Sequence, residues 1–134
     1  MIQEDRTLLI KDLCARLPYG VKCVALLKQL DGSLKSVSGS FKGYNGWAMV
    51  GTNMVDINTV VPYLRPLSSI TEKEKKELGN YAAAIMIASQ DKNPLFQLTR
   101  EAFLGDFFNE HHFDYRGLIE KKLAFEAPEG MYKF

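Results

Sequence analysis

Leucine residues recur at helical spacing near the start of the chain, at Leu9, Leu13 and Leu17. This period predicts an amphipathic helix over residues 6–17, with Asp5 as its N-cap because a carboxylate accepts hydrogen bonds from free backbone N–H groups. The polar face of this helix is expected to hold Lys11, Asp12, Ala15 and Arg16. Pro18 and Gly20 then end the helix.

Short apolar runs follow and predict strands at 21–28, 34–41, 47–50 and 54–57. The intervening Asp31-Gly32 and Asn45-Gly46 pairs are typical of hairpin turns, because those turns require positive φ angles. Short strands joined by tight turns predict a small, strongly bent antiparallel sheet of about four strands, either SH3-like or a partial barrel. Residues 60–67 contain Pro62 and Pro66, which exclude a helix interior or a central strand and indicate an extended or single-turn connector.

Helical patterns dominate the second half of the chain. Thr71 and Glu74 match the capping-box pattern T-x-x-E, which predicts a helix over residues 72–89. A second helix is predicted over residues 100–112, where Phe103, Phe107 and His111 recur every four positions.

Asp114 is expected to cap a short third helix over residues 115–122. Residues 123–134 lack periodicity and are expected to form an extended tail that is ordered where it finds a groove. The chain is therefore predicted to be one α+β domain with three sections. These are an N-terminal helix plus sheet (1–67), a helical section packed with it (68–122) and the tail (123–134).

Composition and charge exclude several classes of protein. The chain has 134 residues, 17 basic and 16 acidic side chains, and a formal net charge of +1. This balance argues against a strongly basic nucleic-acid wrapper and against an acidic disordered chain. Cys14 and Cys23 lack metal-finger spacing and are expected to be reduced thiols. The start of the chain lacks a signal-peptide pattern, and the longest apolar stretch, 82–88, is too short to span a bilayer, so a cytoplasmic protein is expected.

One cluster of residues carries potential chemistry: Asp106, Glu110, His111, His112 and Asp114. Histidine and carboxylate groups together can bind a divalent metal or transfer protons. Adjacent side chains on a helix point about 100° apart, however, so His111 and His112 share one ion poorly. A metal-dependent enzyme at these histidines is therefore the least favoured hypothesis, and we predict no catalytic residue, no metal and no cofactor. Nucleotide-binding and hydrolase motifs are absent from the sequence.

Several stretches resemble small uncharacterised proteins of prophages and other mobile elements of gut bacteria. The longest is HHFDYRGLIEK at 111–121, followed by EAPEGMY at 126–132. Residues 63–69 (YLRPLSS), 71–76 (TEKEKK) and 17–22 (LPYGVK) also match that group. The resemblance implies a phage or mobile-element setting and carries no activity, cofactor or partner over to any residue.

These observations favour a non-catalytic protein-binding or assembly protein. The very apolar 100–112 helix and the aperiodic tail are suited to docking on another chain, and a homodimer through the C-terminal helices is the simplest form. The candidate interaction residues are Phe103, Phe107, Phe108, His112, Tyr115 and Arg116. The alternative is a nucleic-acid-binding regulatory module, although the chain lacks a basic stripe. Under that alternative the sheet would contact nucleic acid through Lys35, Lys42, Tyr44 and Trp47.

Overall fold

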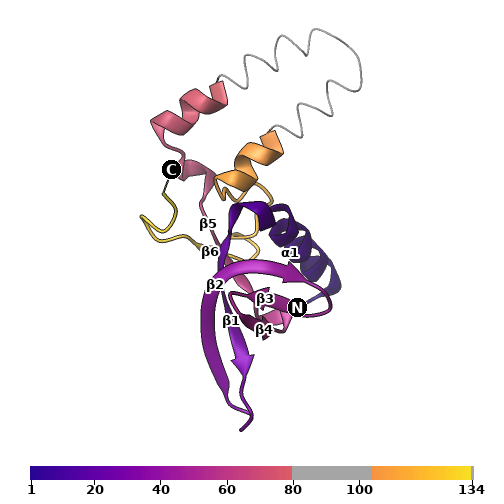
Figure 1. The fold of residues 1–134 in the computed structure, drawn as a ribbon. Coiled ribbons are helices and arrows are strands. Elements are labelled where there is room, and N and C mark those ends of the chain that lie inside the picture. Colours follow the sequence, from indigo (N-terminus) through magenta and orange to yellow (C-terminus); the bar gives the residue numbers. More distant parts are fainter. Residues whose placement is uncertain (80–103, 134) are drawn as a thin grey trace.

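The computed structural model describes residues 1–79 and 104–133, and their centre is an open sheet of six strands (Figure 1). The strands are β1 (Lys22–Lys28), β2 (Leu34–Tyr44), β3 (Ala48–Val50), β4 (Asn53–Val55), β5 (Val61–Leu64) and β6 (Phe125–Glu126). They lie in the order β4-β3-β2-β1-β5-β6, and all neighbours are antiparallel except the parallel pair β5 and β6. The α+β class is confirmed. The expectation of an SH3-like or partial barrel of about four antiparallel strands is wrong, because the tail supplies a sixth strand at one edge and the sheet stays open.

The two hairpin turns expected from the sequence are confirmed. Gly32 and Gly46 have φ angles of 86° and 74°, values that glycine adopts without steric cost. Strand β2 bends sharply at a register shift between Phe41 and Gly43. Just before that bend, a Cβ atom on Gly39 would lie 3.2 Å from the Cα of Gly51, so glycine lets the two backbones approach closely.

Helix α1 (Gln3–Ala15) begins earlier than expected. Its N-cap is Ile2, which makes no side-chain cap, so the prediction of Asp5 as the N-cap is wrong. Asp5 lies instead in the first turn, where its negative charge faces the positive end of the helix dipole. The chain leaves the helix through a short 3-10 helix, η1 (Leu17–Tyr19), and turns at Gly20 with φ of 66°.

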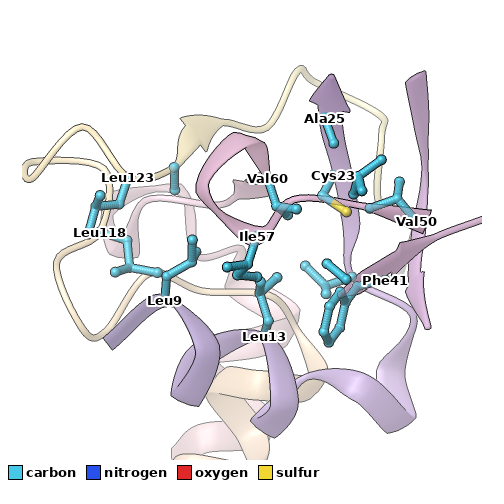
Figure 2. Packing of buried hydrophobic residues seen from close by; sticks show 14 of the residues in the cluster. Leu9, Leu13, Cys23, Ala25, Phe41, Val50, Ile57, Val60, Leu118 and Leu123 are labelled. Carbon is cyan, nitrogen blue, oxygen red and sulfur yellow. The ribbon is translucent and has the colours of Figure 1, made fainter. Parts of the chain in front are cut away.

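A hydrophobic core joins the N-terminal helix and the sheet to residues 118–124 (Figure 2). Leu9 and Leu13 of α1 are fully buried, as their spacing predicts. They pack with side chains from the sheet and with C-terminal side chains far away in sequence. The sheet and its following turn contribute Cys23, Ala25, Phe41, Val50, Ile57 and Val60, and the C-terminal part contributes Leu118, Leu123 and Ala124.

Residues 61–64 are extended, as expected, but the exclusion of a central strand is wrong, because Val61–Leu64 forms β5 between β1 and β6. The ladder between β5 and β1 is short, with Val24 opposite Val61 and Cys23 opposite Pro62. A proline without an N–H group is tolerated in so short a ladder. The strand predicted at 54–57 is likewise shorter than expected, since β4 ends at Val55 and a 3-10 helix, η2 (Ile57–Thr59), follows.

The helical section is partly described. Residues 72–79 and 104–110 are helical, and the remainder of the two predicted helices lies outside the described residues. The capping box is confirmed: the Glu74 backbone N–H donates to Thr71 Oγ1 (3.2 Å) and the Thr71 backbone N–H donates to Glu74 Oε1 (3.0 Å). The predicted short helix at 115–122 is wrong. Asp114 does accept hydrogen bonds from backbone N–H groups, but these belong to turns at Leu118 and Ile119.

Candidate functional site

A buried ionic cluster, which we call the Arg16 joint, consists of Asp12, Arg16 and Arg116. The Asp12 carboxylate accepts from Arg16 Nε (2.9 Å) and from Arg116 Nη1 (2.6 Å). Both Asp12 and Arg16 are fully buried. The Arg16 guanidinium also donates to the backbone carbonyls of Phe108 and Phe113, so it ties α1 to the C-terminal part of the chain.

Asp12 and Arg16 were expected on the polar face of the first helix, opposite the apolar stripe, yet both are buried. The helical period assigns faces only within one helix, and it carries no information about a partner about a hundred residues away. The C-terminal part of the chain covers this side of α1, and each buried charge has an opposite charge or a carbonyl oxygen as its partner. Pairing of this kind is what makes burial of a charge tolerable.

A second cluster, the Arg65 joint, consists of Arg65, Glu74 and His111. Arg65 donates two hydrogen bonds to Glu74, at 2.6 and 2.7 Å, in the bidentate arrangement typical of arginine and a carboxylate. The Arg65 guanidinium also lies 4.3 Å from the centre of the Phe113 ring. His111 Nδ1 lies 2.7 Å from Glu74 Oε2. The joint therefore links the end of β5 to the 72–79 helix and to the residue that follows the 104–110 helix.

Electrostatics keep Glu74 ionised within this joint. Burial alone would raise the pKa of Glu74, but hydrogen bonds from Arg65 and Thr71 outweigh burial and lower the pKa to about 2. The carboxylate is thus an acceptor at neutral pH and already engaged by three neighbours. It is poorly placed to act as a general acid or base at that pH.

The turn after the 104–110 helix places His112 in a left-handed conformation, with φ of 59°. The Phe113 N–H donates to Phe108 O (2.9 Å) and the His112 N–H donates to Asn109 O (3.2 Å), which is the Schellman pattern. Glycine usually occupies this position because a side chain is strained there. The imidazole here is buried and stacks on Tyr132, with ring centres 4.1 Å apart.

Burial, together with the positive charge of Arg16, lowers the pKa of His112 from 6.5 to about 4. Between pH 6.5 and about 4, His112 binds a proton in the unfolded chain but stays neutral in the folded chain. The free energy of unfolding should therefore fall as the pH drops from 6.5 towards 4. We expect His112→Asn to remove this decline, since asparagine tolerates positive φ but does not titrate. The contribution of His112 to this decline cannot exceed about 1.4 kcal/mol of unfolding free energy per pH unit.

Urea denaturation of both proteins at several pH values between 7 and about 4.5 measures this difference, and the lower limit avoids the titration of Glu74. Equal slopes for wild type and variant would contradict the assignment.

The structure brings the predicted interaction residues together, but mostly inside the fold. Phe107 and His112 are buried, whereas Phe108, Tyr115 and Arg116 are half-buried. Phe108 lies edge-on to Phe113, with ring centres 6.3 Å apart, and the Arg116 guanidinium lies 4.2 Å from the centre of the Tyr115 ring. Phe103 lies outside the described residues. The described members of this set therefore leave little surface for a partner.

The four residues proposed for nucleic-acid contact are spread along β2 and the turn that follows it, and do not gather at one place on the sheet. Lys35 pairs with Leu27 near the outer end of the β1–β2 hairpin, whereas Tyr44 pairs with Ala48 at the opposite end of β2. Lys42 lies in the bulge between those ends. Trp47 is 56% exposed and lies in the turn before β3.

Sequence reasoning missed Tyr132 and Arg65, which anchor the C-terminal part of the chain. Tyr132 lies in an aperiodic stretch, and Arg65 lies in a stretch interpreted as a connector. Neither position gave a periodic signal, because a long-range hydrogen bond leaves no trace in the spacing of apolar residues.

The described residues also limit the chemistry available. Within 1–79 and 104–133, no three His, Cys, Asp or Glu side chains gather in an arrangement that could hold a metal ion. None of the helices in the same ranges has the length and apolar character that crossing a membrane requires. Cys14 is exposed and Cys23 is buried, and both are free thiols.

The described features define an α+β protein with an open mixed sheet and two buried ionic joints. Compared with protein-family models, with curated proteins and with solved structures, the chain shows no match.

Proposed function

We propose that this chain is a non-catalytic protein-binding or assembly protein, and that it contacts its partner through the outer half of the β1–β2 hairpin. We call this part, residues 26–36, the arm. Figure 1 shows the arm extending away from the remainder of the sheet to a free tip. Three leucines on it are exposed: Leu26 by 40%, Leu34 by 63% and Leu30 completely. This exposed apolar arm is the observation that carries the proposal.

The arm is poorly supported by the remainder of the protein. Strand β5 pairs with β1 at Cys23 and Val24, and β3 pairs with β2 from Phe41 onward. The Leu26 N–H donates to Thr59 Oγ1 (3.2 Å), but beyond that bond the arm is, among the described strands, a two-stranded ribbon without a neighbouring strand. Such a ribbon is marginally stable in water, and its free backbone groups can extend the sheet with a strand from another protein.

The ionisable groups support a non-catalytic role. In both joints each carboxylate is held by arginine. Arg16 and Arg65 also donate to backbone carbonyls, and Arg116 donates to the side-chain oxygen of Asn109. Groups engaged in this way position elements of the fold and have little freedom to bind or activate a substrate. A protein partner is also favoured over nucleic acid, because the lysines and aromatic residues of the sheet are spread over its two ends.

The phage or mobile-element setting rests on the motif resemblance alone. The structure does suggest a physical role for that motif. Residues 111–121 and 126–132 include His111, Arg116 and Tyr132, which hold the joints and the tail in place. Residues that maintain the fold do not identify a partner, because such a fold is compatible with many partners. The arm is therefore the surface to test for partner binding.

Replacing both Leu26 and Leu34 by serine should abolish partner binding without unfolding the protein. Leu34 is 63% exposed and Leu26 is 40% exposed, so their combined loss should lower the free energy of unfolding by no more than about 2 kcal/mol. The measurement is affinity capture from the native host, quantified by mass spectrometry. A true partner should fall at least about tenfold with the variant, as expected when an apolar contact worth more than about 1.4 kcal/mol is lost.

Leu17→Ser is the matched control, because Leu17 is also 40% exposed but lies in η1, away from the arm. A partner retained by the control and lost by the arm variant supports the proposal. Equal capture by the wild type and the arm variant would refute it.

A further inference from the structure

The segment of residues 125–133, which we call the tail, is held to the body at separate anchor points. At its start, β6 pairs in parallel with β5, with Tyr63 opposite Phe125, and the Ala127 N–H donates to Leu64 O (2.7 Å). At its end, the Tyr132 hydroxyl accepts from the Lys22 backbone N–H and donates to Tyr63 O, both at 2.8 Å.

The Tyr132 side chain fills the binding site near the end of the tail, and we call this side chain the plug. Its ring covers the buried His112, and Lys22 Nζ donates to the carbonyl of the preceding Met131 (3.1 Å). Burial raises the pKa of Tyr132 to about 12, so its hydroxyl remains protonated and can donate. The site thus contacts a short strand at the start of the tail and a tyrosine hydroxyl near its end.

The middle of the tail is loosely seated. The chain turns at Pro128, whose carbonyl accepts from the Met131 N–H, and Gly130 has φ of 82°. Hollows flank this turn on both sides: Tyr19 and His112 line one, and Arg65 and His111 line the other. Phe125, at the start of the tail, is 53% exposed. The tail therefore bridges from anchor to anchor and can be released without opening the core.

We call the surface that the tail covers, which includes Lys22, Tyr63, Leu64 and His112, the groove. We propose that this groove also accepts the tail of a second copy of the chain, so that two molecules associate by exchanging tails. Release of the tail would expose Leu64 O, Tyr63 O and the Lys22 N–H to water, and a segment with the same donors and acceptor can re-form these hydrogen bonds. The chemistry of the occupant is known from the structure, because the chain's own tail fits the groove. Every copy carries the same segment, and exchange of an identical element forms no new type of contact.

The hinge is expected where the tail leaves the core. Leu123 and Ala124 are buried in the core cluster and stay with their own chain, whereas the residues from Phe125 onward are peripheral. Nine residues in extended form span roughly 30 Å, which is enough to reach a neighbouring molecule.

The first test uses a fluorescent peptide with the sequence of residues 125–134 and the full-length protein. Tyr132→Ala in the protein removes the plug of its own tail, so the peptide should bind this variant saturably. Binding to the wild type should need at least about tenfold more peptide, because the attached tail competes at an effective concentration in the millimolar range. The same peptide with alanine at the tyrosine position should bind at least about tenfold more weakly.

Tyr132→Phe provides a second acceptor if the alanine variant fails to fold, because it loses the hydroxyl and keeps the ring. Absence of saturable binding to both variants at about 1 mM peptide would overturn the proposal, since the groove would then not accept a tail in trans.

The second test mixes two full-length chains that each carry one defect. Tyr132→Ala has an intact groove and a defective tail, whereas His112→Asn has an intact tail and a groove without its stacking ring. Light scattering of the mixture should show twice the 15.2 kDa mass at concentrations where each chain alone is a monomer. A mixture that stays monomeric would overturn exchange between copies, even if the free peptide binds.

Both chains should also carry the Leu26→Ser and Leu34→Ser changes, which removes association through the arm. The proposal does not rest on the arm, and failure of tail exchange leaves the partner-capture experiment unaffected.

Discussion

Asp12→Ala should lower the free energy of unfolding by about 3–5 kcal/mol, which is the range expected when one member of a buried ion pair is removed. The carboxylate of Asp12 is the acidic member of the Arg16 joint, and both Asp12 and Arg16 have no exposed side-chain surface. Without it, the Arg16 guanidinium stays buried beside Arg116 with only carbonyl oxygens as acceptors. Urea denaturation at pH 7 measures the loss.

A double variant distinguishes charge burial from simple loss of packing. Asp12→Leu combined with Arg16→Met replaces the pair by apolar side chains and leaves Arg116, which is 14% exposed and can turn to water. We expect this double variant to be more stable than Asp12→Ala, because no uncompensated charge remains at the centre of the joint. A double variant that is less stable than Asp12→Ala would contradict this explanation.

Phe113→Ala should also cost about 3–5 kcal/mol, as expected for loss of a fully buried phenylalanine ring. Phe113 has no exposed surface, and its ring lies beneath the Arg65 guanidinium and close to the rings of Phe107 and Phe108. The loss should therefore loosen the Arg65 joint as well as leave a cavity. Chemical denaturation measures the change in stability.

Phe125→Ala is the matched control for Phe113→Ala. Its ring is 53% exposed at the edge of the sheet, so its removal should cost about 1 kcal/mol or less. Similar losses for the two variants would show that Phe113 does not hold the joint as we describe.

Local patterns in the sequence were sufficient for the parts of the fold that local physics determines. The leucine period located α1, although its N-terminus was placed three residues too late. The Asp-Gly and Asn-Gly pairs located two hairpins, because those turns depend on the φ angles of the turn residues themselves. The capping box at Thr71 and Glu74 was likewise readable, since its two hydrogen bonds join residues three positions apart.

Contacts between distant segments could not be predicted in the same way. Strand β6 has two residues and pairs with a strand about sixty positions earlier, so it has no period of its own. The burial of Arg16 depends on carbonyls of Phe108 and Phe113, and a helical period treats arginine as a surface residue. Val61–Leu64 forms a strand because it pairs with β1 and β6, despite the presence of Pro62.

The candidate site follows the same division. The sequence singled out His111 and His112 as a possible pair of metal ligands, and their neighbours in the fold give them different roles. His111 lies against Glu74, and His112 stacks on Tyr132. The sequence predicted the arm only as two strands and a turn. Its exposure arises because no further described strand pairs with it, and the local sequence pattern does not report such pairing.

The Arg16 joint also constrains how the protein can fold during synthesis. Residues 1–16 leave the ribosome well before residues 108–116, which supply the acceptors and the second arginine for their buried charges. Until those residues emerge, α1 must keep Asp12 and Arg16 hydrated and cannot dock as it does in the finished molecule. Translation past residue 116 is therefore required before α1 can close onto the core, and chains interrupted before residue 108 are expected to be substrates for chaperones or proteases.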